Sequence, residues 1–333
     1  MKDSFNRSID YLRISITDRC NLRCIYCMPE KGVESIPHDS ILSLEEFARI
    51  IKVLSSAGIK HVRFTGGEPL VRKGLVSLVE QTAAIEGIES VALTTNAILF
   101  PSMAKDLKKA GLSRVNISLD TLDEDQYRFI TRRGNLHDAL HGIQSALEYD
   151  FSPVKLNTVV VRSLEQDLLS FAKLTIDQPL HVRFIEYMPV GEGLSCGGCG
   201  WGIEEVIPAQ EILTTINQNA QKEGLGTLQP LHENKPVGWG PATYYKLPNA
   251  QGSIGVISAI SNHFCASCNR LRLTSDGKLK PCLFSDVEYD LRKAVRTGSD
   301  EDILNIFSQA IATKPEGHQQ RIGTKRMMSQ VGG

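Results

Sequence analysis

Short apolar and β-branched runs recur along the first two thirds of the chain, and amphipathic helical patterns lie between them. One helix is predicted to begin at Ser43, where Glu46 three residues later completes a capping box. Others are predicted to begin near Pro101, Asn135 and Pro208. The apolar runs predict six strands, at residues 11–17, 60–65, 90–95, 114–119, 154–161 and 180–185.

Strands that alternate with helices form βαβ units around a parallel sheet. Six such units are too few to close an eight-stranded barrel, so we expect an α/β fold in which residues 1–220 form an open, partial (β/α)6 barrel of the TIM type. Residues 221–333 are expected to form a smaller β-plus-helix unit with two terminal helices. Its predicted antiparallel strands lie at residues 241–247, 252–260, 269–274 and 278–283.

Composition and charge narrow the function classes. Hydrophobic residues make up 41% of the 333 residues, which excludes a largely disordered chain. The 37 Lys and Arg against 38 Asp and Glu leave a net charge of −1, so any cationic site must be local. No apolar run approaches the ~20 residues of a bilayer span, and the N-terminal residues do not resemble a secretory signal. We expect a cytoplasmic protein that binds neither nucleic acid nor membrane.

The eight cysteines fall into three tight groups, a spacing typical of metal ligands rather than of a disulfide framework. The first group, Cys20, Cys24 and Cys27, has the pattern C-x3-C-x2-C after the first strand. A cubane iron–sulfur cluster normally takes four cysteines, so three thiolates leave one iron open to a small molecule. A zinc site completed by a distant residue is the alternative. Two neighbours favour the cluster: Tyr26 is placed to lie beside a bound ring, and the glycines of the GGEP turn at residues 66–69 let backbone carbonyls approach a ligand.

The second group consists of Cys265, Cys268 and Cys282, again without a fourth cysteine nearby. Period-two alternation places Cys268, Arg270 and Arg272 on one face of a strand. Arginine pairs bind phosphates through bidentate hydrogen bonds, so this face predicts a phosphorylated ligand beside a metal centre. A solvated cationic face is the alternative.

The turn at residues 275–277 allows two registers for the hairpin that carries this group. A two-residue Asp-Gly turn puts Cys282 on the face opposite Cys268. A three-residue loop with Gly277 in the left-handed region pairs residue 270 with residue 282 instead. We predict the three-residue loop, because only that register lets all three thiolates meet one cluster.

The C-x3-C-x2-C motif with an aromatic residue before its last cysteine, followed by GGEP, resembles the radical S-adenosylmethionine family. The resemblance implies that Cys20, Cys24 and Cys27 hold a [4Fe–4S] cluster, whose open iron is chelated by the methionine part of S-adenosyl-L-methionine. It also implies that an electron from the cluster cleaves this cofactor to a 5′-deoxyadenosyl radical. The protein then binds and orients the cofactor and excludes water and oxygen.

Longer motifs narrow the resemblance to the branch of this family that cyclises GTP in the first step of molybdenum cofactor (molybdopterin) biosynthesis. They include YLRISITDRCNLRCIYCMP, VRFTGGEPLVR, VRFIEYMPVG and CNRLRLTSDGKLKPCLF, and they run in order over nearly the whole chain. The resemblance implies a second [4Fe–4S] cluster on Cys265, Cys268 and Cys282 that binds guanine through its open iron. The radical would remove the ribose C3′ hydrogen, and C3′ would then bond to guanine C8.

The same resemblance implies further partners and residue roles. The partners are an electron donor of the flavodoxin or ferredoxin type and a downstream cyclic pyranopterin monophosphate synthase. A homodimer is compatible with the sequence, which does not decide the oligomeric state. The Gly332-Gly333 tail is implied to enter the active site in a catalytic role. The implied S-adenosylmethionine contacts are Tyr26, Gly67, Ser118 and Met188, and the implied GTP contacts are Arg13, Arg63, Thr94, Lys155, Arg270 and Arg272.

Each of these residues also has an ordinary structural interpretation. Tyr26 and Met188 can be core residues, the barrel arginines can pair with carboxylates, the strand hydroxyls can bond to backbone, and Lys155 can be solvated. Two features depart from the family pattern. Ala97 stands where the family usually has glycine, and it is strained if φ is positive there. The C-x2-C pair Cys196 and Cys199 is not expected in the family, and we interpret it as two loop thiols rather than half of a zinc site.

Two other function classes stay open at this point. One is a radical maturase acting on a peptide, since such enzymes also carry auxiliary clusters. The other is a zinc or iron–sulfur scaffold or sensor, which would show full four-ligand sites and would not cleave the cofactor.

Overall fold

The structure, a computed structural model, describes residues 1–34, 36–190, 201–318 and 324–332. The described strands form a twelve-stranded sheet in the order β12-β11-β10-β1-β2-β3-β4-β5-β6-β9-β8-β7. The first six strands pair in chain order, each parallel to its neighbour, which confirms the predicted βα sheet. They are β1 (Tyr11–Ser15), β2 (His61–Thr65), β3 (Ser90–Thr95), β4 (Arg114–Ser118), β5 (Val154–Val160) and β6 (Leu180–Glu186).

The later strands extend this sheet at both of its edges. Strand β9 pairs parallel with β6 and β10 pairs parallel with β1, while β8 and β11 pair antiparallel with β9 and β10. The edge strands of an open barrel present unpaired backbone groups, and the late strands satisfy them. The division of the chain near residue 220 stays a prediction. The late strands are β7 (Gln229–Pro230), β8 (Thr243–Lys246), β9 (Ser253–Ile257), β10 (Arg270–Leu273), β11 (Lys278–Lys280) and β12 (Tyr289–Asp290).

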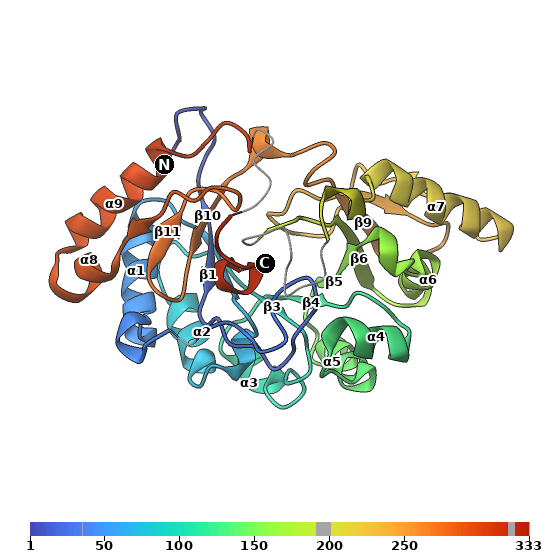
Figure 1. Ribbon diagram of the computed structural model, residues 1–333, viewed down its shortest axis with the longest axis horizontal. Helices are drawn as coiled ribbons and strands as arrows, with labels where there is room; N and C mark the ends of the chain where they lie inside the picture. Colours follow the sequence, from blue (N-terminus) through green and yellow to red (C-terminus); the bar gives the residue numbers. More distant parts are fainter. Residues whose placement is uncertain (35, 191–200, 319–323, 333) are drawn as a thin grey trace.

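Helices cover the outer side of the curved sheet, and the C-terminus lies near its centre beside β1 (Figure 1). None of the described helices is both long and apolar enough to cross a bilayer. The helices are α1 (Leu44–Ser56), α2 (Leu75–Ala83), α3 (Ala104–Lys109), α4 (Glu124–Thr131), α5 (Leu136–Glu148), α6 (Leu168–Asp177), α7 (Ala209–Lys222), α8 (Arg292–Thr297), α9 (Asp300–Ala312) and α10 (Met328–Val331).

The helix starts follow the capping signals in the sequence. The Ser43 side chain accepts from the Glu46 backbone, and the Glu46 side chain accepts in return, so the capping box is confirmed. Asn135 caps α5, and α7 begins directly after Pro208. The helix expected near Pro101 begins later, because the chain first turns through residues 97–103.

The hairpin of β10 and β11 has the predicted three-residue loop. Arg272 lies opposite Lys280, so two further pairs along the register bring residue 270 opposite residue 282. The Thr274 N–H donates to the Lys278 carbonyl at 2.9 Å, and Gly277 has φ +75°. Cys282 therefore shares a face with Arg270, as predicted.

Ala97 has φ +66°, the left-handed backbone conformation in which the sequence predicts strain for a residue other than glycine. Its methyl group is fully buried and lies against Gly142 of α5. A Cβ on Gly142 would lie 2.4 Å from the Ala97 carbonyl oxygen and 2.6 Å from the Ala97 Cβ. Gly142 therefore makes the room that lets α5 pack on this turn.

Gly142→Ala is expected to lower the free energy of unfolding by about 1–3 kcal/mol, because the added methyl group overpacks the contact with the Ala97 turn. Urea unfolding of the cluster-free chain measures this, with the exposed neighbour His141→Ala as the matched control. Adding Ala97→Gly should recover only part of the loss, because the carbonyl clash remains. A Gly142→Ala chain as stable as the control would contradict the packing argument.

Candidate active site

The loop that follows β1 carries the first cysteine group and is held by the GGEP turn after β2. The Gly67 N–H donates to the Thr17 carbonyl and the Glu68 N–H donates to the Arg19 carbonyl, both at 2.8 Å. A Cβ on Gly66 would lie 2.2 Å from the Thr17 carbonyl oxygen, and one on Gly67 would lie 2.3 Å from that of Arg19. The missing Cβ atoms thus admit the backbone of the cysteine loop, whereas the sequence analysis assigned this room to a ligand.

Cys20, Cys24 and Cys27 line one cavity at the carboxyl ends of the strands. Burial, followed by the negative charges of Cys27, Asp120 and Cys20, raises the pKa of the Cys24 thiol well above its usual value. Burial also raises the pKa of Cys20 to about 11. The neighbouring thiols of Cys20 and Cys27 thus oppose the ionisation of Cys24. Such a cluster fits a cationic metal centre, because a bound cation reverses this balance and deprotonates its thiol ligands.

The four residues assigned to the cofactor from the sequence also line this first cavity: Tyr26, Gly67, Ser118 and Met188. Thr94 lines it as well. The Tyr26 hydroxyl donates to Asp120 Oδ2 at 2.5 Å. Asp120 also accepts from the Val159 N–H at 2.9 Å, and burial raises the pKa of its carboxyl to about 6. Tyr26 is therefore a fixed wall of the cavity. Asp120 was not assigned from the sequence, although it lies two residues after Ser118, which was.

Glu68 is a second buried carboxyl that the sequence analysis did not assign. It accepts from the Thr95 hydroxyl and the Asn96 N–H, both at 2.7 Å, and from the Leu70 N–H at 3.0 Å. Burial raises the pKa of Glu68 to about 7. The carboxyl thereby ties the end of β3 to the GGEP turn, and its place in that motif was the available signal.

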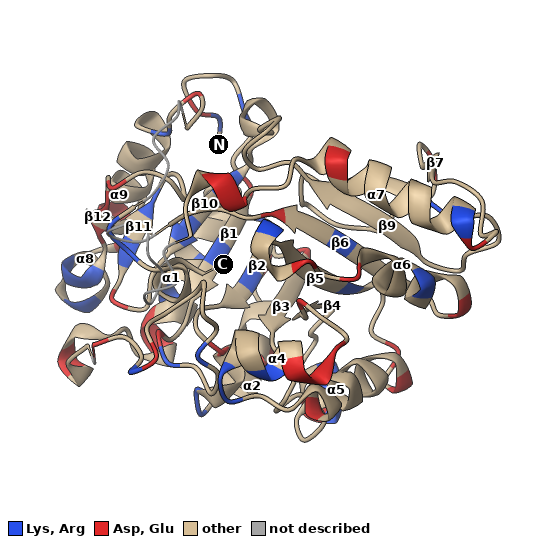
Figure 2. Ribbon diagram, turned by 45° about the vertical axis from the view of Figure 1, so that its right-hand side comes forward, with Lys and Arg blue, Asp and Glu red and all other residues tan. Residues whose placement is uncertain are grey.

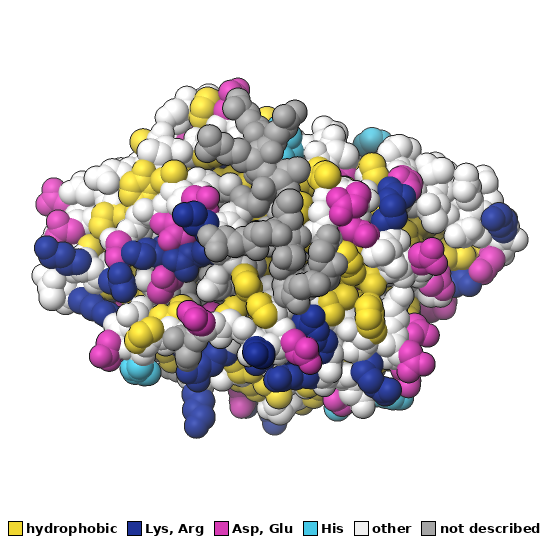
Figure 3. Space-filling view, in the orientation of Figure 1, with side chains coloured by type: hydrophobic (Ala, Val, Ile, Leu, Met, Phe, Trp, Pro, Cys, Tyr) yellow, Lys and Arg dark blue, Asp and Glu magenta, His cyan; other side chains and the backbone are white. Residues whose placement is uncertain are grey.

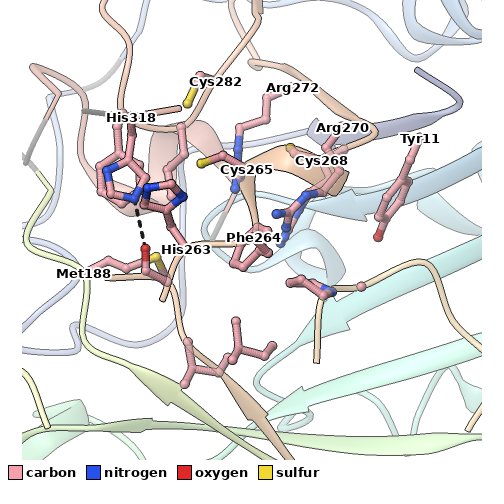
Figure 4. Close-up of a pocket in the computed structure, with 18 of the residues that line it drawn as sticks. Tyr11, Met188, His263, Phe264, Cys265, Cys268, Arg270, Arg272, Cys282 and His318 are labelled. Atoms are coloured by element: carbon pink, nitrogen blue, oxygen red, sulfur yellow. Dashed lines mark hydrogen bonds between the residues drawn. The ribbon is translucent and has the colours of Figure 1, made fainter. Parts of the chain in front are cut away.

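The second cysteine group and five arginines line another cavity (Figure 4). Cys265, Cys268 and Cys282 come from two segments and reach the same cavity, as the three-residue loop requires. Figure 2 marks the basic positions on the central strands. The arginines are Arg13 on β1, Arg63 on β2, Arg183 on β6, and Arg270 and Arg272 on β10.

None of the described residues that line this second cavity is acidic. Burial, followed by the charge of neighbouring arginines, lowers the pKa of Arg13 well below its usual value and that of Arg272 to about 10. The surface is different: basic and acidic side chains are interspersed over the face shown in Figure 3. The net charge of −1 implied that any cationic site would be local. The site lies inside the barrel. Arg183 was missed, and its signal was the VRFIE strand, which resembles the VRFT strand of Arg63.

Two residues assigned to GTP do not line the second cavity. Thr94 lies in the first cavity, where its hydroxyl accepts from Arg63 Nη1 at 3.3 Å. Lys155 is buried, and its ammonium group donates to the Val237 carbonyl at 2.8 Å. Burial, and then the charges of Arg183, Arg63 and Arg114, lower the pKa of Lys155 to about 6. The solvated interpretation of Lys155 is therefore wrong, because the 236–240 segment covers it.

The C-terminal tail runs between the two cavities. Met328 of α10 lines both of them, together with Met188, Asn157 and Ile185, so the cavities adjoin. Arg272 Nη1 donates to the Val331 carbonyl at 3.0 Å and also to the Gly332 carbonyl. Gly333, the other predicted tail residue, lies outside the described residues, as do Cys196 and Cys199.

Two family models match the chain. The Radical SAM superfamily matches residues 14–174, and Molybdenum Cofactor Synthesis C matches residues 180–320. Curated relatives match over the full length of both chains: GTP 3′,8-cyclase of Desulforamulus reducens is 51% identical, and that of Pelotomaculum thermopropionicum is 50% identical. The chain belongs to the GTP 3′,8-cyclase family.

Solved structures share the fold at low identity. SuiB of Streptococcus suis bound to S-adenosylmethionine has a TM-score of 0.62 at 14% identity, covering 89% of this chain and 65% of that one. Methylornithine synthase (PylB) has a TM-score of 0.51 at 18% identity, covering 63% and 62%. These likenesses show the partial-barrel fold alone. Membership of the radical S-adenosylmethionine superfamily implies one [4Fe–4S] cluster and S-adenosylmethionine, which the cysteine loop and its cavity fit.

Gly67→Ala is expected to cost the protein about four irons per chain, because the new Cβ displaces the backbone of the cysteine loop. Iron analysis after anaerobic reconstitution measures this. Gly224→Ala is the control: it adds the same methyl group in open space after α7, and its positive φ of +73° strains only that exposed turn. Circular dichroism separates a local loss from unfolding, and full iron content in a folded Gly67→Ala protein would show that the close contact does not position the loop.

Proposed function

We propose that the chain is a radical S-adenosylmethionine enzyme that cyclises GTP to (8S)-3′,8-cyclo-7,8-dihydroguanosine 5′-triphosphate, the first step of molybdenum cofactor biosynthesis. Full-length identity of about half to curated GTP 3′,8-cyclases supports the reaction. The observation that carries the proposal is the pair of adjoining cavities, each with three cysteines, of which one also holds five arginines and no described acidic side chain. A nucleoside triphosphate is the class of ligand that balances such a site.

The first cavity is proposed to bind S-adenosylmethionine beside the cluster held by Cys20, Cys24 and Cys27. The bound cluster and cofactor supply a 5′-deoxyadenosyl radical that removes the C3′ hydrogen of the substrate. The chain itself shapes and seals the site. Tyr26 stays fixed against Asp120, and Met188 stands where the two cavities meet.

The second cavity is proposed to bind GTP. Cys265, Cys268 and Cys282 would hold a second [4Fe–4S] cluster with one iron open to guanine. The fit rests on the donor set: burial raises the pKa of Cys268, but the charges of Arg270 and Lys314 outweigh it and bring that pKa down to about 6. A thiol that ionises near neutral pH is ready to bind iron. The arginines then hold the triphosphate through bidentate hydrogen bonds.

Roles for the remaining predicted residues follow from their positions. Arg13 and Arg63 face the second cavity from β1 and β2 and are proposed triphosphate contacts. Lys155 reaches the triphosphate only if the 236–240 segment releases its ammonium group. Proposed partners are a low-potential electron donor of the flavodoxin or ferredoxin type and the synthase that converts the product to cyclic pyranopterin monophosphate.

Anaerobic incubation with reductant, S-adenosylmethionine and GTP tests the reaction. 5′-Deoxyadenosine and a cyclised GTP product should both form, and both should depend on GTP. Guanosine in place of GTP should give at least ~100-fold lower kcat/KM, because each lost charged hydrogen bond is worth about 1.5–3 kcal/mol. Cofactor cleavage that is indifferent to GTP would contradict the proposal and favour a peptide substrate.

Gly332→Ala tests the proposed role of the tail. Gly332 has φ +73°, and a Cβ there would lie 2.4 Å from Thr65 Cγ2. The variant should therefore keep about eight irons and its fold, yet lose at least ~10-fold in cyclisation rate, since small misplacements near reacting atoms are costly. Iron analysis, thermal melting and product formation are the measurements. Unchanged turnover would refute a catalytic role for the tail.

A further inference from the structure

Three side chains with metal-binding atoms meet at one end of the second cavity. Cys265 Sγ and one ring nitrogen each of His263 and His318 all lie within 4.8 Å of one another. The two rings meet edge to face with their centroids 4.8 Å apart, and Figure 4 shows them side by side next to Cys265. His263 is exposed, so an ion in solution can reach the group. The proposed reaction uses Cys265 alone of the three.

His318 is arranged as a metal ligand usually is. Its Nε2 lies 3.0 Å from the Ala259 carbonyl oxygen, and because a carbonyl can only accept, Nε2 carries the proton. Nδ1 therefore keeps its lone pair, and this buried atom has no hydrogen-bond partner within the part of the chain that the structure describes. Metal-binding histidines typically donate their other ring N–H to a carbonyl or carboxylate. An unsatisfied buried acceptor otherwise costs about 1–3 kcal/mol.

Cys265 and His318 are also linked through the backbone. The His318 N–H hydrogen-bonds to Cys265 Sγ, while burial raises the pKa of this thiol overall. The segment after α9 thus lies against the short turn at Cys265–Ser267, although the two are more than fifty positions apart in the sequence. One sulfur and two imidazole nitrogens are a donor set typical of divalent iron, cobalt and zinc.

We propose that, in the chain without its second cluster, His263, Cys265 and His318 bind a single divalent cation of borderline softness, Zn²⁺ or Fe²⁺. Zinc bonds of 2.0–2.3 Å place tetrahedral donors about 3.5 Å apart, so the present spread of up to 4.8 Å must close by about 1 Å. Because Cys265 is also a proposed cluster ligand, the single ion and the cluster exclude each other.

The test is cobalt and zinc titration of the full-length, cluster-free chain under anaerobic, reducing conditions. Cys20, Cys24, Cys27, Cys196 and Cys199 are first replaced by serine, because those thiols bind cobalt on their own. One Co²⁺ per chain should bind, with thiolate-to-cobalt charge-transfer absorption. Zinc-edge X-ray absorption on the same protein should show one sulfur and two imidazole nitrogens. Three sulfur ligands, or no metal bound, would overturn the proposal.

Variants assign the donors. His318→Ala and His263→Ala should each weaken cobalt binding at least tenfold, whereas the exposed α5 histidine variant His137→Ala should leave it unchanged. Cys268→Ser should matter far less than Cys265→Ser. Equal losses in the two cysteine variants, with no effect of either histidine, would identify a three-thiolate site and overturn the proposal. Melting curves establish that each variant is folded. X-ray absorption on the parent chain tests the donor set even where a histidine variant does not fold.

The exclusion between the two metal states rests on the proposed function. A zinc-loaded chain with its first cysteine group intact should take up about four irons instead of eight on reconstitution, and His318→Ala should restore eight. Zinc that binds without lowering iron uptake would overturn the shared role of Cys265. A chain that never holds more than four irons, even without zinc, would contradict the proposed second cluster. The cobalt titration would still decide the single-ion site.

Discussion

Five guanidinium groups face one cavity inside the barrel, and their mutual repulsion is the constraint that organises the site. Burial disfavours each charge, and the pKa values of Arg13, Arg183 and Arg272 are all lowered by burial first. No described acidic residue on the wall offsets them. The cavity is therefore suited to groups that carry negative charge, such as thiolates of the cysteine hairpin or an anion from outside the chain.

The open barrel makes this concentration of charge accessible. Strands β10 and β9 attach at opposite edges of the six-stranded core, so the C-terminal hairpins line the cavity that the core strands begin. Arg272 thereby comes level with Arg13, and Arg270 with Tyr11, although more than 250 residues separate the two strands along the chain. In a closed eight-stranded barrel of this kind the interior would be filled by packed side chains.

The C-terminal tail contacts one of these cavity arginines. Arg272 donates hydrogen bonds to the Val331 and Gly332 carbonyls. Arg326 anchors the preceding segment to Asp276 at 2.9 Å and to Glu288 at 2.6 Å. Asp276 belongs to the turn that sets the register of Cys282. One short hairpin therefore positions a cysteine, two arginines and the chain terminus together, which explains why a methyl group on Gly332 is expected to disturb chemistry without disturbing the fold.

The sequence by itself determined the local features. The six core strands, the Ser43 capping box, the left-handed Gly277 turn and the metal-binding spacing of the cysteines each follow from interactions within a few residues. The structure alone decided which distant segments meet: the parallel docking of β9 and β10, the addition of Arg183 to the cavity, the covered ammonium of Lys155, and the placement of His318 against Cys265. Periodicity and spacing describe one segment at a time. These contacts depend instead on which sheet edge is left unpaired and on how buried charged groups from different segments interact within one cavity.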